Sequence, residues 1–180
     1  MTMVEKYIKK GDIAVDATAG NGNDTIALSN LAGASGKVYA FDIQEEAIVR
    51  TGKLLAESSL FHNVVLIRDS HEKLSSYIEE KRRVSAVVFN LGYLPTGNKD
   101  IHTKAESSIT AIKESLGILR KGGLISIVMY PGTEAGKKER DAVFGYAKSL
   151  SPEKVHVCRC DAPNQPGDPP EIIWIEVKCF

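Results

Sequence analysis

The stretch that most constrains the fold is residues 14–25, where an apolar run is followed by a carboxylate, a turn with two glycines and residues that begin helices. Asp16 closes the apolar run, and Gly20 and Gly22 lie in the turn. Glycine adopts backbone conformations closed to other residues and lets a ligand approach the main chain without a Cβ in the way. The stretch therefore predicts a strand, a loop and a helix, with a nucleotide-type pocket at the loop.

The rest of the chain alternates short apolar runs with amphipathic segments. The run 84–91 is apolar almost throughout, as expected for a parallel strand covered on both faces. Thr103 and Glu106 form a capping box for a helix that Gly122 and Gly123 would end. Strands are expected at 13–17, 37–42, 63–68, 84–91, 124–130, 155–160 and 172–178, and helices from about residue 23 and at 44–59, 72–82, 104–120 and 134–150.

The last two predicted strands decide the fold class. Residues 161–170, which join them, contain four prolines and leave no room for a crossover helix, so the two strands should pair antiparallel. This predicts a Rossmann-like α/β fold with a seven-stranded, mostly parallel sheet, a C-terminal antiparallel strand pair and helices on both faces. That layout is typical of class I methyltransferases rather than of six-stranded dehydrogenases.

Size and charge indicate the number of domains and limit the possible binding partners. With 180 residues, 43% of them hydrophobic, the chain is expected to form one domain over residues 1–180. Lys plus Arg and Asp plus Glu both number 23, so any nucleic-acid affinity must come from local patches such as 9–10, 81–83 and 137–140, each of which could also be a solvated helix end or loop. The sequence shows neither a membrane-spanning run nor a signal peptide, and a cytoplasmic location is expected.

The three cysteines do not suggest a metal site or a redox motif. Cys158 and Cys160 alternate on one face of a predicted strand, which is neither zinc-knuckle nor CxxC spacing. We interpret all three as reduced thiols, mostly buried, and expect no metal.

The glycine loop indicates the kind of ligand. In a dinucleotide-binding loop a third glycine lets the helix pack closely while its N-terminus meets a pyrophosphate. Here Thr25 fills that position, and Asp16 and Asp24 bring negative charge, which disfavours a phosphate and favours a cationic ligand. S-adenosylmethionine, with a sulfonium and an ammonium group, suits this charge better than NAD does. A turn with a purely structural role is the alternative.

Polar side chains also follow the second and third predicted strands. Asp42 lies 20 positions after the second glycine, at a strand end where a carboxylate can accept hydrogen bonds from both hydroxyls of a ribose. Gln44 can reach the same sugar or the adenine. At the third strand end, Ser70 and His71 are candidates for the adenine edge. The alternatives are that Asp69 or Ser70 only caps the next helix and that His71 is an exposed first-turn residue.

The loop after the 84–91 strand is expected to face the methyl acceptor. Asn90 and Tyr93 stand at i and i+3, like the Asn and Tyr of the Asn-Pro-Pro-Tyr loop of amino-methyltransferases, although the two central prolines are absent. The Asn90 carbonyl can accept a hydrogen bond from an amine and so point its lone pair at the methyl group, with Tyr93 as a wall or stacking surface. Such positioning supplies roughly 7–11 kcal/mol when the geometry is right. The alternative for Asn90 is a strand-end turn former.

Four motifs together resemble a known family. They are Asp-Ala-Thr-Ala-Gly-Asn-Gly-Asn-Asp-Thr at 16–25, Asp-Ser-His at 69–71, Asn-Leu-Gly-Tyr-Leu-Pro at 90–95 and Tyr-Pro-Gly at 130–132. Over nearly the full chain the sequence resembles the rRNA methylase family of small class I S-adenosylmethionine-dependent methyltransferases. Members are tRNA 5-(aminomethyl)-2-thiouridine methyltransferases, which methylate the aminomethyl nitrogen of the wobble uridine and work as homodimers.

The resemblance implies a cofactor, a partner and site residues. It implies S-adenosylmethionine as the cofactor, an RNA substrate with the tRNA anticodon loop favoured, and a loop at 90–99 that faces the amine. Thr133 departs from the family pattern, which has histidine there, so no base is assigned; segment 164–170 would border the substrate mouth or serve only as a rigid hairpin connection. The residues implied to contact the cofactor are Asn21, Asn23, Asp42, Gln44, Ser70 and His71.

The leading hypothesis is therefore an N-methyltransferase acting on the aminomethyl group of a wobble uridine in tRNA. Methylation of a base in ribosomal RNA is the second hypothesis, because the same fold and loop permit it. A cofactor-binding module without catalysis and an NAD-dependent oxidoreductase are the other two.

Overall fold

The computed structural model describes residues 3–58, 61–92 and 103–179, which form a seven-stranded sheet in the order β3-β2-β1-β4-β5-β7-β6. Strands β1 to β5 are parallel, whereas β7 pairs antiparallel with both β5 and β6. The predicted sheet, with its C-terminal antiparallel pair, is confirmed. The strands are β1 (Ile13–Asp16), β2 (Lys37–Phe41), β3 (Val64–Ile67), β4 (Val84–Leu91), β5 (Leu119–Met129), β6 (Val155–Cys160) and β7 (Glu171–Val177).

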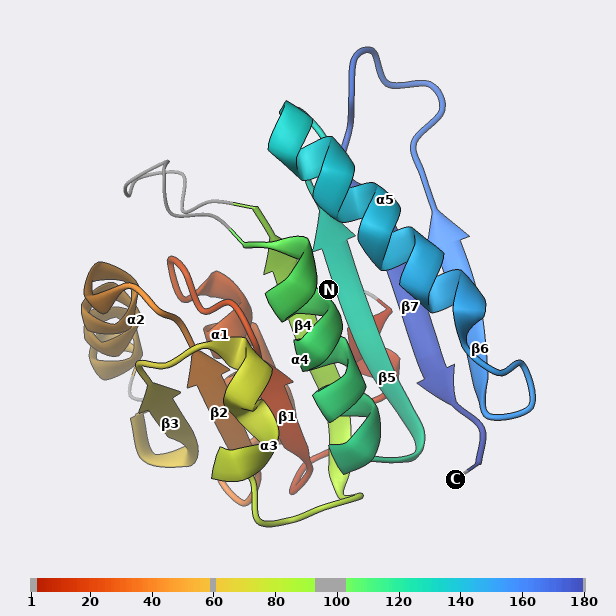
Figure 1. Cartoon of the computed structure of the whole chain (residues 1–180). Coiled ribbons are helices and arrows are strands. Elements are labelled where there is room, and N and C mark those ends of the chain that lie inside the picture. The colour runs from red at the N-terminus through yellow and green to blue at the C-terminus, as the bar shows by residue number, and fades with distance from the viewer. Residues whose placement is uncertain (1–2, 59–60, 93–102, 180) are drawn as a thin grey trace.

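Helices cover both faces of the sheet, as predicted. The helices α3, α4 and α5 lie together on one face (Figure 1), while α1 and the N-terminal turn η1 pack on the other. Among the described residues, none of the helices combines the length and the apolar character needed to cross a membrane. The helices are η1 (Val4–Lys6), α1 (Asn23–Ala32), α2 (Glu45–Glu57), η2 (Phe61–Asn63), η3 (His71–Lys73), α3 (Leu74–Tyr77), α4 (Ala105–Ile118) and α5 (Glu134–Ser149).

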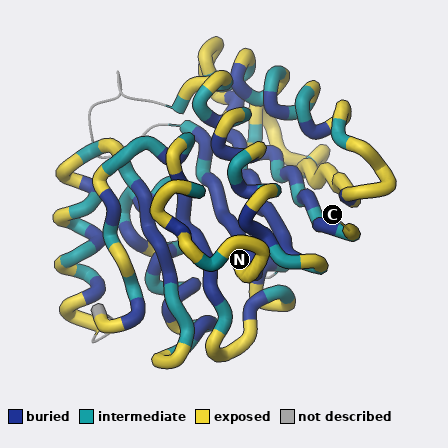
Figure 2. Tube along the Cα trace, turned by 60° about the horizontal axis from the view of Figure 1, so that its bottom comes forward, coloured by how far each residue is buried: buried dark blue, intermediate teal, exposed yellow. Residues whose placement is uncertain are grey.

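The core consists of one apolar layer on each face of the sheet. Phe41, Phe89 and Ile112 belong to the layer beneath α3, α4 and α5, and Leu28 belongs to the layer on the opposite face. The central strands β1, β2 and β4 are buried along most of their length, while the outer sides of the helices are exposed (Figure 2). Every residue of β4 is buried except Asn90, near its carboxyl end. A partly exposed polar residue therefore interrupts an otherwise buried strand at the edge where ligands bind in such folds.

The helix predicted at 72–82 is much shorter than expected. The chain forms η3 and then α3, which ends at Tyr77, and Ile78 is already extended. Leu74 and Ile78 are buried, as their spacing indicates, but the following residues turn toward β4 and Arg82 has a φ of 59°. A left-handed residue cannot continue a right-handed helix, so the charged segment 79–83 belongs to the turn.

The predicted capping box of α4 is wrong. Lys104 is the N-cap residue and makes no side-chain cap bond, and Glu106 is exposed. Thr103 instead donates its hydroxyl hydrogen to Glu139 of α5, at 2.7 Å, and Ser108 donates to the other oxygen of the same carboxylate, also at 2.7 Å. Glu139 is buried, and a buried carboxylate needs such partners. Thr103 therefore links α4 to α5.

The glycine pair at 122–123 does not end α4, which stops at Ile118. Both glycines lie inside β5, where the register with β4 shifts between the partners of Val84 and Ala86. Gly122 has a φ of 70°, and a Cβ on Gly123 would lie 2.9 Å from a backbone oxygen of its own strand. The glycines serve a bulge, which depends on pairing with a strand far away in the sequence.

All three cysteines are free and exposed, so the prediction that they are mostly buried is wrong. Cys158 and Cys160 pair with Trp174 and Ile172, and they share one face of β6 as predicted. However, β6 is the edge strand, and its residues 156–160 are all exposed. Alternation correctly indicated a common face, but it does not show whether anything covers that face.

Candidate active site

A cavity of about 810 Å³ lies at the carboxyl ends of the parallel strands. These strand ends form the upper edge of the sheet in Figure 1. Its volume falls within the roughly 300–1,000 Å³ typical of ligand sites, and β1 and β4, where the strand order reverses, adjoin it. Tyr93 lies outside the described residues. The other residues predicted for the site all line the cavity: Asn21, Asn23, Asp42, Gln44, Ser70, His71 and Asn90.

The glycine loop needs its glycines. Gly20 and Gly22 have φ angles of 54° and 84°, in the left-handed region that favours glycine. A Cβ on Gly22 would lie 3.0 Å from the hydroxyl oxygen of Thr51 on α2, so the loop packs closely against that helix. The Ala19 N–H donates to the Phe41 carbonyl at 2.8 Å, which ties the loop to the end of β2.

Asp16 does not contribute its charge to the cavity, which corrects the expectation for this residue. It is completely buried, accepts a hydrogen bond from the Thr25 hydroxyl at 2.6 Å and another from the Thr18 N–H at 3.1 Å, and does not line the cavity. Burial is the main cause that raises its pKa from 3.8 to about 7; the nearby Asp24 and Asp42 act in the same direction, and the Thr25 and Thr18 bonds act against it. Asp16 and Thr25, the residue in the third glycine position, form a structural pair beneath the loop.

Asp42 joins the loop to the sugar side of the cavity. Its Oδ2 accepts a hydrogen bond from the Gly20 N–H at 3.0 Å, and its Oδ1 accepts one from the Gln44 N–H at 2.9 Å. Each carboxylate oxygen has further lone-pair capacity for a ligand hydroxyl. Ile43, between Asp42 and Gln44 in sequence, lines the cavity although 52% of its surface is exposed. Its apolar side chain, beside the Asp42 carboxylate, provides a surface on which a flat ring can pack. The sequence did not predict this residue as part of the site.

The carboxylate of Asp69 is occupied within the protein. It accepts hydrogen bonds from Lys73 at 2.9 Å, from Tyr77 at 2.7 Å and from the Ser70 N–H at 2.7 Å. The Lys73 bond, followed by the Tyr77 bond, lowers the pKa of Asp69 to about 2. Ser70 accepts a hydrogen bond from the Glu72 N–H at 3.4 Å and so caps η3, as one alternative interpretation predicted. It also lines the cavity.

His71 is buried rather than an exposed first-turn residue. Its Nδ1 lies 3.2 Å from the Ala17 carbonyl oxygen, which assigns the proton to Nδ1 because a carbonyl only accepts. Its ring meets Phe89 edge-on, and burial lowers the pKa of the imidazole below 6.5. The neutral ring thus braces the β1 loop and keeps Nε2 as an acceptor.

Asn90 is held by three neighbours. Its backbone N–H donates to the Thr18 hydroxyl at 2.7 Å, and its Nδ2 donates to Oδ2 of Asp24 at 2.7 Å. The Tyr130 hydroxyl donates a longer bond, 3.4 Å, to Oδ1 of Asn90. Tyr130 is 46% exposed at the cavity, and burial of its ring together with the charge of Asp24 raises the pKa of its phenol. Asp24 comes from α1, Asn90 from β4, and Tyr130 from the position that follows β5. Sequence reasoning missed Tyr130 as a site residue, although it begins the Tyr-Pro-Gly motif.

Two other predicted features lie outside the cavity lining. Thr133 is the N-cap residue of α5, where its hydroxyl accepts a bond from the Gly136 N–H at 3.0 Å. Segment 164–170 connects β6 to β7, does not line the cavity, and holds Asp168, which pairs with Lys137 at 3.0 Å. The hairpin interpretation therefore describes this segment.

The charges of the cavity fit a cationic ligand. Asp24, Asp42 and Asp69 line it, and Lys104 is the one lysine or arginine that lines it within the described chain. A pyrophosphate would meet carboxylates here, whereas S-adenosylmethionine would find acceptors for its cationic groups and ribose hydroxyls and an apolar contact at Ile43 for its adenine. The residues present thus fit S-adenosylmethionine and disfavour NAD.

Comparison with known proteins identifies the family. Residues 38–176 match the family model described as “Putative rRNA methylase”. The chain belongs to this family. Its class I fold and its membership of the rRNA methylase family place it among the S-adenosylmethionine-dependent methyltransferases.

Two solved structures are closely similar to this chain. A “putative rRNA-methylase” from Clostridium thermocellum superposes with a TM-score of 0.95 at 41% identity, covering 98% of this chain and 94% of that one. A “putative methyltransferase” from Streptococcus mutans, solved in complex with SAH, superposes with a TM-score of 0.89 at 39% identity over the same shares of the two chains.

A curated relative of this rRNA methylase family member comes from Arabidopsis thaliana. It is named tRNA (mnm(5)s(2)U34)-methyltransferase, chloroplastic, and is 40% identical over 173 residues, which cover 92% of this chain and 63% of the relative. The chain thus spans less than two thirds of the length of the curated relatives it matches.

Proposed function

We propose that this chain is an S-adenosylmethionine-dependent N-methyltransferase acting on RNA, as a single domain over residues 1–180. Its substrate is the aminomethyl group of 5-aminomethyl-2-thiouridine at the wobble position, presented in the tRNA anticodon loop. The observation that carries the proposal is the Asn90 amide at the cavity, whose NH₂ group is bound by Asp24 and whose carbonyl oxygen is directed to the Tyr130 side. The name of the Arabidopsis relative, a tRNA wobble methyltransferase, supports the choice of RNA.

The side chains divide the chemistry between two sides of the cavity. The cofactor supplies a methyl group on a positively charged sulfur. On the cofactor side, Asp42 is fixed by the N–H groups of Gly20 and Gln44 and so presents a preorganised acceptor for ribose hydroxyls. On the acceptor side, Asn90 accepts a hydrogen bond from an amine N–H, which directs the nitrogen lone pair toward the methyl group. The substrate ammonium loses its proton to water before it binds, so no protein base is required.

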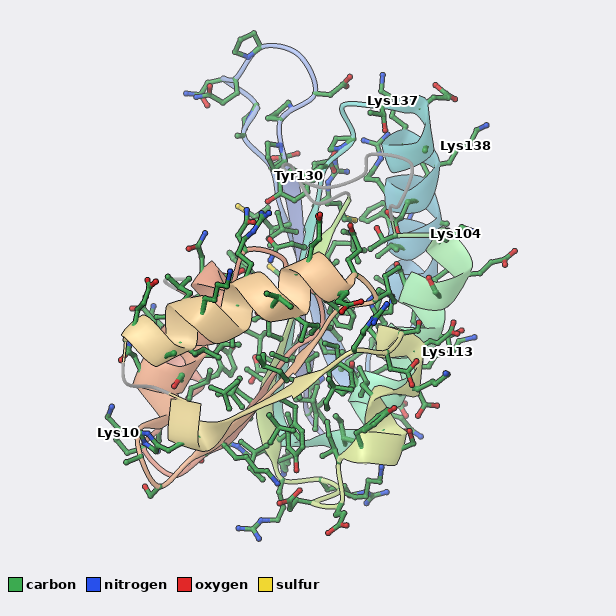
Figure 3. The ribbon with its side chains drawn as sticks, turned by 90° about the vertical axis from the view of Figure 1, so that its left-hand side faces the viewer. Lys10, Lys104, Lys113, Tyr130, Lys137 and Lys138 are labelled. Atoms are coloured by element: carbon green, nitrogen blue, oxygen red, sulfur yellow. The ribbon has the colours of Figure 1, made fainter. Side chains whose placement is uncertain are left out.

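Lysines lie on the same side of the molecule as the cavity. Lys104 lines the cavity, and Lys137 and Lys138 lie in the first half of α5, near Tyr130 in the view of Figure 3. Lys10, from another of the basic patches, lies at the opposite end of the same view. In a chain with no net charge, such a local patch can supply the phosphate contacts that RNA binding needs.

We expect the double variant Lys104→Ala/Lys138→Ala to bind tRNA more weakly while its affinity for S-adenosylhomocysteine stays unchanged. If each lysine contacts one phosphate, the slope of log affinity against log salt should fall by about 0.7 per lysine. Fluorescence anisotropy with labelled tRNA at several salt concentrations measures this slope. Lys10→Ala is the matched control, and an equal loss of slope in that variant would contradict the assignment of the surface.

The substrate itself is tested on tRNA from a strain that lacks the gene. Digestion to nucleosides and mass spectrometry should show loss of 5-methylaminomethyl-2-thiouridine and accumulation of the aminomethyl precursor. An unchanged level of the methylated nucleoside would refute the proposed substrate. Loss of a methylated base from ribosomal RNA instead would favour the second hypothesis, to which the family description points.

We also propose that the protein is a cytoplasmic homodimer. The edge strand β6 offers an uncovered surface for a second copy, with residues 156–160 exposed and Val157 exposed over 39% of its surface. A monomeric mass by light scattering at assay concentrations would contradict the dimer. The Arabidopsis relative is chloroplastic, so location is tested separately by imaging a fluorescent fusion.

A further inference from the structure

Asp24, which binds the Asn90 amide, belongs to a different element of the fold from Asn90. It is the second residue of α1, lines the cavity, and places Oδ2 at 2.7 Å from Nδ2 of Asn90, 66 residues away in sequence. A carboxylate near a helix N-terminus is favoured by the helix dipole, which accounts for its presence there but not for its direction. The direction is toward the side chain that faces the methyl acceptor.

The contact determines which end of the Asn90 amide faces the substrate. The oxygen and nitrogen of an amide have nearly the same shape, so only hydrogen-bond partners distinguish its two orientations. An ionised carboxylate only accepts, so Asp24 binds the NH₂ group, and the Tyr130 hydroxyl donates to the oxygen on the other side. Both neighbours select the same orientation.

We infer that Asp24 is a positioning residue that holds the Asn90 carbonyl oxygen toward the reacting amine, and that Asp24, Asn90 and Tyr130 together form an amine-selective acceptor subsite. This inference rests on the proposed function in taking the acceptor to be an amine. Without Asp24 the Asn90 amide can turn over and present its NH₂ group, which repels the N–H groups of the substrate. The negative charge of Asp24 also favours an amine, whose N–H groups carry partial positive charge, over a carbon acceptor at this end of the cavity.

The subsite can be tested without RNA by using sinefungin. This analogue of S-adenosylmethionine carries an amine where the sulfonium methyl would be, so its amine projects toward the acceptor, whereas S-adenosylhomocysteine has no group there. Calorimetry should show that Asp24→Ala weakens sinefungin binding by about tenfold or more, as expected for a hydrogen bond to a charged group, with S-adenosylhomocysteine affinity unchanged. Asp24→Asn, which keeps an acceptor but loses the charge, should fall between the wild type and Asp24→Ala.

The control is Glu57→Gln, which removes one exposed negative charge at the end of α2, outside the cavity lining. It should bind both ligands like the wild type. Equal losses of sinefungin and S-adenosylhomocysteine affinity in Asp24→Ala would overturn the inference, because Asp24 would then serve the cofactor or the folded loop. Unchanged affinity for both ligands would overturn it as well.

The same variants separate this inference from the proposed function. With aminomethyl-containing tRNA, Asp24→Ala should lower kcat and leave the KM for S-adenosylmethionine unchanged, and Asp24→Asn should restore part of the rate. A wild-type protein that does not methylate this tRNA would refute the proposed function, and the sinefungin measurements would still decide the role of Asp24. A wild-type protein that methylates it at the same rate as Asp24→Ala would refute the role of Asp24 alone.

Discussion

Replacing Asn90 with alanine is expected to lower kcat/KM for RNA methylation by about 100-fold or more. The amine then loses the acceptor that directs its lone pair, and a misplacement of about 1 Å between reacting groups carries a cost of this order. The fold should tolerate the change, since the backbone N–H of residue 90 keeps its 2.7 Å bond to the Thr18 hydroxyl. Methyl transfer from labelled S-adenosylmethionine to tRNA, together with calorimetry of S-adenosylhomocysteine, separates the loss of rate from any loss of cofactor binding.

A matched control is Asn30→Ala, which removes an exposed asparagine from α1 outside the cavity lining. It should methylate tRNA at the wild-type rate. Full activity of Asn90→Ala in a complemented deletion strain would favour the module without catalysis, because the cofactor side of the cavity would then suffice for the biological role. Loss of both methylation and cofactor affinity would instead assign Asn90 to the cofactor.

Local pattern was sufficient to predict the sheet and the side of the sheet on which the site lies. The apolar run of β4 predicted a strand covered on both faces, and its bounds match the observed Val84–Leu91. Because parallel strands end at one edge, the polar residues at the carboxyl ends of β1, β2, β3 and β4 had to converge, and Asp42, Ser70, His71 and Asn90 all line one cavity. Periodicity and turn chemistry determine such features within short windows of sequence.

The features that sequence reasoning missed depend on contacts between distant residues. The glycines in β5 looked like a helix stop, but their conformation serves a bulge opposite β4. Asp24 was recognised as a charge, whereas its bond to Asn90 spans 66 residues and depends on how α1 packs beside β4. Asp16 was assigned to the cavity, yet full burial removes it from the site, and only the folded structure shows that Thr25 covers it.

The burial of Asp16 leads to a second large expected effect, on the pH dependence of stability. Its pKa is about 7 in the folded protein against 3.8 for the free side chain, so between these values the folded state holds a proton that the unfolded state has lost. The free energy of unfolding must therefore decrease as pH rises through this window. The raised pKa of Asp16 contributes roughly 4 kcal/mol to the free energy of unfolding. This contribution is present in full below pH 3.8 and is lost as pH rises to about 7.

Asp16→Asn isolates this contribution, because an amide resembles the protonated acid and does not titrate. Its oxygen can accept from the Thr18 N–H, and its NH₂ group can donate to the Thr25 hydroxyl. Denaturant unfolding should show the wild type losing roughly 4 kcal/mol relative to Asp16→Asn between about pH 4 and pH 7. His71, whose pKa is lowered by burial, changes stability in the opposite direction, but it is present in both proteins and cancels in the difference. Parallel curves for the two proteins would refute the buried, protonated Asp16.

Thr25→Val should change the pH dependence of stability in the opposite direction from Asp16→Asn. The Thr25 bond lowers the pKa of Asp16, so removing the hydroxyl should raise that pKa further and enlarge the pH-dependent loss of stability. Denaturant unfolding of Thr25→Val at pH 4 and pH 7 measures this loss, and a loss equal to that of the wild type would contradict the role of the Thr25 bond.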